Sequence, residues 1–415
     1  MNSDNSIMSV VRSARLSKLL IFSYVVDWIL IFLIVIVGAI FAIITPNKRP
    51  FSLTNPGISF PHVEETVSVP LLGLVALVAP AAIIFIICAL LVPGPTVPKS
   101  TPKQLIFQRK LWEWHTGWLG LALSQAAAFL ITSGMKNLFG KPRPDLLDRC
   151  QPDIPNLSEY SYSVWGAGNS FANFNVVSAG ICTQTDSSKL DDGFRSFPSG
   201  HASFASGGLV YLSLFLASKL AITIPFLAAG SDATRLSAFP SRTEKRAVDG
   251  IGGRDRALSG EHAPEIPSGH DEKIIAARNQ AAAPPIYLLV IVVIPFFASV
   301  YITASRYSDF RHDGFDLSFG FLLGAITSLF AFRYYHLPIN QGAGWSWGPR
   351  SRDRAFWAGV GVGNYAGDRE PRSEAVRQTA TGLEAGAGVQ RISVANDDRI
   401  ELLDYGRNPQ RRPWV

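Results

Sequence analysis

Six long apolar segments alternate with polar stretches along this chain. A helix needs about 20 apolar residues to cross the hydrocarbon core of a bilayer, and each segment comes close to that length. The pattern predicts an all-α, polytopic membrane protein with six transmembrane helices. The expected spans cover approximately residues 19–44, 70–92, 112–135, 202–224, 285–304 and 315–332.

Three polar stretches lie outside these spans. Residues 1–18 form a basic N-terminal arm, residues 229–284 mix both charge signs with Ser, Gly and Pro, and residues 336–415 are rich in Gly, Arg and Asp. We expect the insert and the tail to be disordered, since such compositions bury too little apolar surface to fold. The six-span domain then covers residues 19–335.

The basic residues indicate how the chain is oriented. Hydrophobic residues make up 47% of the chain, charged residues make up 17%, and the net charge is +6. The arm and the loop at 93–110 are strongly basic, which favours the cytoplasm for both termini. We therefore expect a multi-pass protein of an endomembrane, vacuolar or plasma membrane. No nucleic-acid motif accompanies the charge, and no motif specifies an oligomeric state.

With this topology, the long loop between the third and fourth spans faces the lumen or the exterior. Cys150 and Cys182 both lie in it, so we expect a disulfide in that oxidising compartment, with two free thiols as the alternative. Asn156 begins an Asn-Leu-Ser sequon and is a candidate glycosylation site.

Charged residues gather in three segments that the span count brings to this same face. Cations and the backbone amides of a helix start bind anions, and phosphate suits this combination. Two histidines suit in-line displacement, because one can attack phosphorus while the other protonates the departing oxygen. The four-residue spacing of one histidine from a carboxylate places both on one face if a helix begins there, and favours that histidine as the nucleophile. The candidate residues are Lys136, Arg143, Ser199, Gly200, His201, Arg306, His312 and Asp316.

These segments resemble the three-part signature of the type 2 phosphatidic acid phosphatase (PAP2) superfamily. The matching residues are Lys136-x6-Arg143-Pro144, Pro198-Ser199-Gly200-His201 and Ser305-Arg306-x5-His312-x3-Asp316. The stretch from Gly140 to Cys150 further resembles fungal diacylglycerol pyrophosphate and lipid phosphate phosphatases. The family's fold is similar to that of vanadium haloperoxidases and glucose 6-phosphatase.

The resemblance implies a role for each position. His312 would form a phosphohistidine, Asp316 would hold and activate it, and His201 would be the general acid. The remaining candidates would bind phosphate oxygens: Lys136, Arg143, Ser199, Gly200 and Arg306.

The implied activity is metal-independent dephosphorylation of phosphatidate, lysophosphatidate and diacylglycerol pyrophosphate at the bilayer. The sequence contains no Cys/His or carboxylate set with metal-ligand spacing, and we expect neither a metal nor a cofactor. Phosphatases of sphingoid-base phosphates or polyprenyl diphosphates would use the same core residues. A non-catalytic lipid-binding or transport protein is a further alternative. A second Pro-Ser-Gly-His at 267–270 lies in the charged insert with no span after it, so we interpret it as a coincidence.

Overall fold

The computed structural model confirms the all-α class, and its described residues include six helices long and apolar enough to cross a membrane. The N-terminal arm up to residue 17, residues 229–282 of the insert with its second Pro-Ser-Gly-His, and most of the tail lie outside the described residues. The long helices are α2 (Lys18–Ile43), α4 (Ala79–Leu91), α5 (Lys103–Phe139), α9 (Gly200–Lys219), α12 (Ile286–Ser308) and α13 (Gly314–Tyr335). The structure describes residues 18–94, 97–98, 100–162, 176–223, 283–339, 345–350 and 355–356.

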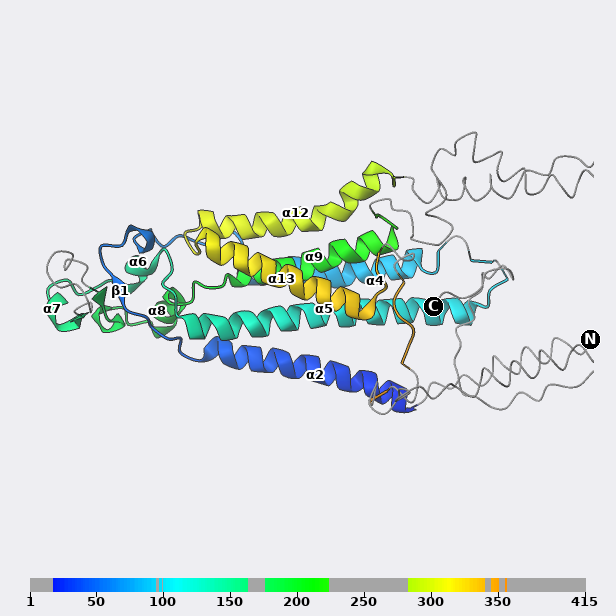
Figure 1. Cartoon of the computed structure of the whole chain (residues 1–415), viewed down its shortest axis with the longest axis horizontal. Coiled ribbons are helices and arrows are strands. Elements are labelled where there is room, and N and C mark those ends of the chain that lie inside the picture. The colour runs from blue at the N-terminus through cyan, green and yellow to red at the C-terminus, as the bar shows by residue number, and fades with distance from the viewer. Residues whose placement is uncertain are drawn as a thin grey trace, which may run out of the picture. The chain divides into compact units, whose positions relative to one another are not determined.

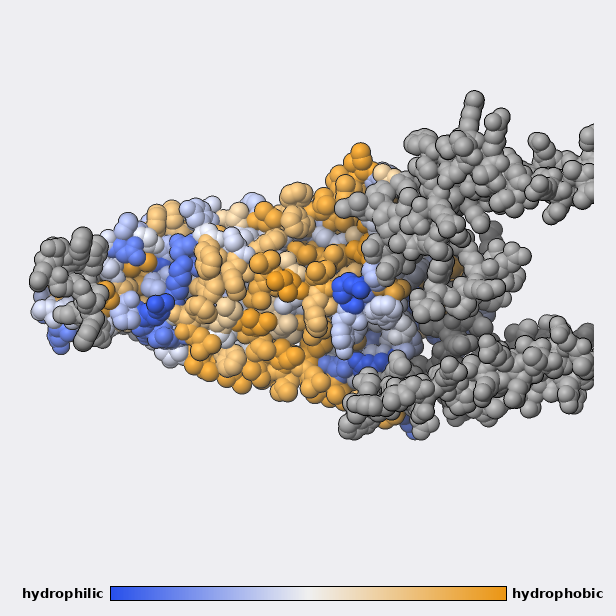
Figure 2. Space-filling view, in the orientation of Figure 1, coloured by the Kyte–Doolittle hydropathy of each residue, from blue (hydrophilic) through white to orange (hydrophobic). Residues whose placement is uncertain are grey.

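The chain divides into two compact units, Met1–Leu30 with Gly348–Val415, and Ile31–Trp347. Within the larger unit, α9 is the central helix and packs against α4, α5, α12 and α13 (Figure 1). It is also the most buried of the spans, so it can carry more Ser and Gly than the others. Figure 2 shows an apolar band over the helices, with hydrophilic residues gathered at the end of the bundle that carries α6 (Leu146–Cys150) and α8 (Ser187–Gly193).

Small residues bring α9 and α13 into close contact. A Cβ atom at Gly324 would lie 2.2 Å from the carbonyl oxygen of Ser203, and one at Gly320 would lie 2.6 Å from that of Ser199. Close backbone approach through small residues is typical of helices that pack within a membrane. As a result the two helices begin side by side, and the amide of Ser199 donates to the carbonyl of Asp316 at 3.1 Å.

The second span is interrupted where the sequence contains Pro80. It consists of α3 (Val69–Gly73), a π-helical turn η2 (Leu74–Val78) and α4. Proline has no N–H, so the carbonyl of Ala76 lacks its usual helical donor. Gln125 on α5 supplies one, with its Nε2 2.7 Å from that oxygen. The buried amide therefore satisfies a carbonyl that could not otherwise be paired within the bilayer.

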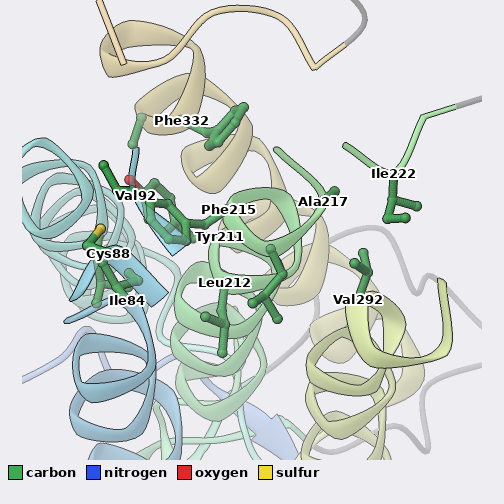
Figure 3. Packing of buried hydrophobic residues seen from close by; sticks show 13 residues of the cluster. Ile84, Cys88, Val92, Tyr211, Leu212, Phe215, Ala217, Ile222, Val292 and Phe332 are labelled. Carbon is green, nitrogen blue, oxygen red and sulfur yellow. The ribbon is translucent and has the colours of Figure 1, made fainter. Parts of the chain in front are cut away.

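An apolar core joins α4, α9, α12 and α13 at the end of the bundle far from the candidate residues (Figure 3). Figure 3 shows Tyr211 and Phe215 of α9 between Cys88 of α4 and Phe332 of α13. The hydroxyl of Tyr211 donates to the carbonyl of Gly117 at 3.0 Å, so this buried polar atom is also paired.

The expected tail begins with a packed segment. The amide and hydroxyl of Ser346 both donate to the carboxylate of Glu113, which is fully buried and also pairs with Lys219 at 2.5 Å and Arg109 at 3.2 Å. Because a buried carboxylate requires such partners, this segment is held against α5 and α9. Order therefore extends beyond our boundary at residue 336.

A small cap lies beyond the helix ends at the hydrophilic end of the bundle (Figure 1). Its central strand β3 pairs antiparallel with both β1 and β2. Cys150 and Cys182 form a disulfide within it, with 4.6 Å between their Cα atoms. The cap elements are β1 (Phe51–Ser52), η1 (Pro56–Ile58), α6 (Leu146–Cys150), α7 (Leu157–Tyr160), β2 (Ser161–Tyr162), β3 (Val176–Val177), η3 (Ala179–Ile181) and α8 (Ser187–Gly193).

Candidate active site

The structure brings the candidate residues together at the end of the bundle that carries the cap. Helices α5 and α12 end there, and α9 and α13 begin there, so residues far apart in sequence meet at one cavity. The cavity has a volume of about 450 Å³. Of the eight candidates, six line it: Lys136, Arg143, Gly200, His201, Arg306 and His312.

His312 is buried, and its Nδ1 lies 2.7 Å from the carbonyl oxygen of Ser196. A carbonyl can only accept, so Nδ1 carries the proton and Nε2 keeps its lone pair. Burial, together with the positive charges of Arg143, Lys136 and Arg306, holds the pKa of His312 well below its ordinary value. His312 is therefore a neutral imidazole at neutral pH, with Nε2 available as a nucleophile.

Asp316 does not contact His312 in the way that the spacing predicts. Helix α13 begins at Gly314, so His312 precedes it, and Asp316 is the third helical residue in a capping box with Asp313. No hydrogen bond or ion pair joins Asp316 to His312 among the described residues. Instead the hydroxyl of Ser196 donates to Asp316 Oδ2 at 2.5 Å. Asp316 is therefore linked to His312 through Ser196, whose hydroxyl donates to the carboxylate and whose carbonyl accepts from the imidazole.

Lys141 neutralises this carboxylate. Its Nζ lies 2.8 Å from Asp316 Oδ1 and 2.8 Å from Asp313 Oδ2. Burial lowers the pKa of Lys141, but the hydrogen bonds to both carboxylates outweigh that effect and raise its pKa above the ordinary value. The ammonium group therefore remains charged. Lys141 lies between two signature positions in sequence, and its charge alone did not distinguish it from other lysines.

The start of α9 lies beside Lys136. Ser199 caps the helix, with its Oγ accepting from the amide of Ala202 at 3.4 Å. A Cβ atom at Gly200 would lie 3.1 Å from Lys136 Nζ, so glycine leaves room for the ammonium group near the helix start. Free amides and the positive end of the helix dipole favour a phosphate at this point.

Two acidic residues that the sequence did not single out also line the cavity. Asp192 pairs with Arg143 at 2.7 Å and with Arg149 at 3.0 Å. Burial raises the pKa of Asp192, but Arg143 and Arg149 outweigh it and hold the pKa well below its ordinary value. The other acid is Glu65, which lies 3.0 Å from Arg306. Neither acid belongs to a motif that could have revealed it.

His201 is the second histidine of the cavity. Its Nε2 lies 3.0 Å from the carbonyl oxygen of Val67, which accepts its proton, and 4.0 Å from Glu65. The described residues include no group of three or more His, Cys, Asp or Glu placed to hold a metal ion.

Comparison of the sequence with models of known protein families identifies the family of this chain. The model of the PAP2 superfamily matches residues 117–339, which is more than half of the chain and includes every candidate residue named above. The chain belongs to the PAP2 superfamily. The match begins within α5 and continues past α13, so Glu65 lies outside it.

Several curated proteins are similar to this PAP2 chain. A probable diacylglycerol pyrophosphate phosphatase 1 of Schizosaccharomyces pombe is 34% identical over 42% of this chain and 52% of its own length. The diacylglycerol pyrophosphate phosphatase 1 of Saccharomyces cerevisiae is 25% identical over 71% of this chain and 74% of its own. A PA-phosphatase related-family protein of Dictyostelium discoideum is 30% identical over 48% of this chain and 53% of its own. The chain thus spans about half the length of several of these relatives. No solved structure matches.

Proposed function

We propose that this protein is an integral membrane lipid phosphate phosphatase that acts on phosphatidate, lysophosphatidate and diacylglycerol pyrophosphate. The observation that carries the proposal is the state of His312, a buried neutral imidazole whose Nδ1 is engaged. It lines a cavity with four cations, Lys136, Arg143, Arg195 and Arg306. That combination suits nucleophilic attack on a phosphate group.

The reaction proceeds in two steps. Lys136, Arg143, Arg306 and the amides at the start of α9 bind the phosphate oxygens. Nε2 of His312 attacks phosphorus, and the P–N bond forms as the bond to the leaving oxygen breaks. His201, protonated as an imidazolium, donates one proton to that oxygen and becomes neutral. Water then attacks the phosphohistidine, its proton passes to His201, and inorganic phosphate leaves with His312 restored. Bound cations neutralise the developing charge in this scheme, so the activity persists without a metal.

The walls of the cavity support a lipid substrate. Ala42 of α2, Phe129 of α5 and Val69 and Leu72 of α3 line it alongside the charged groups. The acyl chains can stay among apolar side chains while the head group reaches the cations. Relatives whose names specify diacylglycerol pyrophosphate and lipid phosphate phosphatases support the same substrate class.

The proposed topology places the cavity on the lumenal or extracellular face, with both termini in the cytoplasm. The Cys150–Cys182 disulfide in the cap agrees with an oxidising compartment on that side. The side chain of Asn156, the sequon residue, is exposed, which suits glycosylation, and its Nδ2 donates to Asp153 at 2.8 Å. Sphingoid-base phosphates and polyprenyl diphosphates would be handled by the same residues.

A substrate panel tests the proposal. Phosphate release is measured from micelles of each lipid phosphate in excess EDTA, for wild type beside His312→Ala. We expect release by wild type and none by the variant, with the preferred lipid identifying the substrate. Release that stops on adding EDTA would refute the metal-free mechanism. Release that survives the loss of His312 would refute its role, and no release from any lipid would favour a non-catalytic lipid-binding protein.

A further inference from the structure

A segment that precedes the second span covers the catalytic groups. We call residues 62–67 the strap. It contacts residues around His312 and Arg306 through both backbone and side-chain atoms. The contacts are His62 Nδ1 to Asp145 at 2.8 Å, His62 N to Asp148 at 2.7 Å, Arg311 to the Val63 carbonyl at 3.0 Å, Thr66 N and Oγ1 to Asp309 at 3.0 and 2.6 Å, and His201 to the Val67 carbonyl at 3.0 Å.

Glu65 is the strap residue that enters the cavity. Its Oε1 accepts a hydrogen bond from Arg306 at 3.0 Å and lies 3.9 Å from Arg311. Its Oε2 lies 4.0 Å from His201. The Arg306 side chain is only 1% exposed, whereas that of Glu65 is 27% exposed. The guanidinium is thus almost wholly covered, and it has two carboxylate partners, Glu65 at 3.0 Å and Asp309 at 3.3 Å.

A carboxylate paired with Arg306 uses N–H donors that could also bind a substrate phosphate. A carboxylate is planar and a phosphate group is tetrahedral, but each can present two oxygens that accept from the guanidinium fork. The Glu65 carboxylate and a phosphate cannot use the same N–H donors at once, and their negative charges would repel each other beside one guanidinium. The strap also holds the proton of His201 through the Val67 carbonyl. Without substrate, the strap therefore engages two groups that the reaction requires.

We propose that Glu65 sets the phosphate affinity of this site by competing with the phosphate group for Arg306. The inference rests on the proposed function, in which Arg306 binds the substrate's phosphate. An incoming phosphate must displace the carboxylate, so its apparent dissociation constant rises by the factor that the Glu65–Arg306 pair imposes. The same competition helps inorganic phosphate to leave after turnover, because Glu65 returns to Arg306 as the product departs.

The chain offers a matched control for this idea. Glu64 is the adjacent residue and is exposed, while Glu65 lines the cavity. Glu64→Gln and Glu65→Gln remove the same charge from neighbouring positions at nearly constant size. A difference between the two variants therefore reports the contact with Arg306 and not the net charge of the loop.

The test is calorimetric titration of inorganic phosphate into the purified full-length protein in detergent with excess EDTA. We expect Glu65→Gln to bind phosphate about tenfold more tightly than wild type, which corresponds to about 1.4 kcal/mol. Glu64→Gln should match wild type. In an Arg306→Gln background, Glu65→Gln should change the affinity less than twofold, since the competed partner is gone.

Three outcomes would overturn the inference. Phosphate affinity could be unchanged or weaker in Glu65→Gln, as expected if Glu65 serves only to orient His201. Glu64→Gln could strengthen binding as much as Glu65→Gln. The gain could also persist in the Arg306→Gln background. Calorimetry needs no turnover, so a wild type that binds phosphate in the expected pattern but hydrolyses no lipid would refute the proposed function and leave the role of Glu65 standing.

Discussion

Ser196→Ala tests the link between Asp316 and His312. The substitution removes the hydroxyl that donates to Asp316 Oδ2 at 2.5 Å, but it keeps the backbone carbonyl that accepts from His312 at 2.7 Å. Both Ser196 and Asp316 are fully buried, so the lost hydrogen bond leaves a charged oxygen short of a partner. A hydrogen bond to a buried charged group contributes about 1.5–3 kcal/mol.

The size of the stability loss depends on the partners that Asp316 keeps in Ser196→Ala. Asp316 keeps Lys141 at 2.8 Å and the amide of Asp313 at 3.4 Å, so its charge is still compensated. We expect Ser196→Ala to lose about 2 kcal/mol of stability, because one charged hydrogen bond is lost while the others persist. Since the carbonyl of residue 196 can then shift, we also expect kcat to fall about tenfold, with KM changed less than twofold.

The assay is phosphate release from the preferred lipid, together with thermal unfolding in the same detergent. The matched control is Ser59→Ala, which removes an exposed hydroxyl that donates only to the Asn55 carbonyl at 2.9 Å. Ser59→Ala should leave both readouts unchanged. If Ser196→Ala were as active as wild type while Asp316→Asn lost activity, Asp316 would act on His312 directly, and the reasoning would be refuted.

Three further predictions concern pH, helix packing and substrate choice. Burial and neighbouring cations lower the pKa of His312 well below 6.5, and the neutral form attacks, so kcat/KM corrected for lipid ionisation should stay level as pH falls through 6.5. A fall in kcat/KM with an apparent pKa at or above 6.5 would contradict this. Gly324→Ala should lower stability in detergent by about 1–3 kcal/mol, since its Cβ would lie 2.2 Å from the Ser203 carbonyl oxygen. Gly348→Ala, with open space around its Cβ, should leave stability unchanged, and equal stability of the two variants would contradict the packing of α13 on α9. Arg195 lines the cavity beside Lys136, Arg143 and Arg306. Because a second phosphate group requires further positive charge, Arg195→Gln should reduce kcat/KM for diacylglycerol pyrophosphate about fivefold more than for phosphatidate. Equal losses for the two substrates would argue against that role.

The sequence predicted the six spans and their convergence because the bilayer leaves few alternatives. A run of about 20 apolar residues has to form a helix there, and counting spans then places three separated motifs at one face. The third helix starts at Lys103 and not near residue 112, since its first turns are polar and escape a search for apolar runs. Hydropathy therefore locates spans better than it locates the ends of helices.

Contacts made by loops could not be predicted in the same way. The spacing of His312 and Asp316 suggested a direct pair, but the helix begins after His312 and the first-turn geometry turns Asp316 toward Ser196 and Lys141. Glu65 lies more than 240 residues from Arg306 in sequence and belongs to no motif. Only the path of the strap over the cavity brings the two together, and that path depends on tertiary contacts.

Trapping the covalent intermediate tests the central claim most directly. The purified protein is mixed with phosphatidate labelled in its phosphate group, quenched in alkali, digested, and analysed for labelled peptides. We predict label on the peptide that contains His312 in wild type and none in His312→Gln, with His201 unlabelled in both. Label on His201, or full turnover in the His312→Gln variant, would contradict the account.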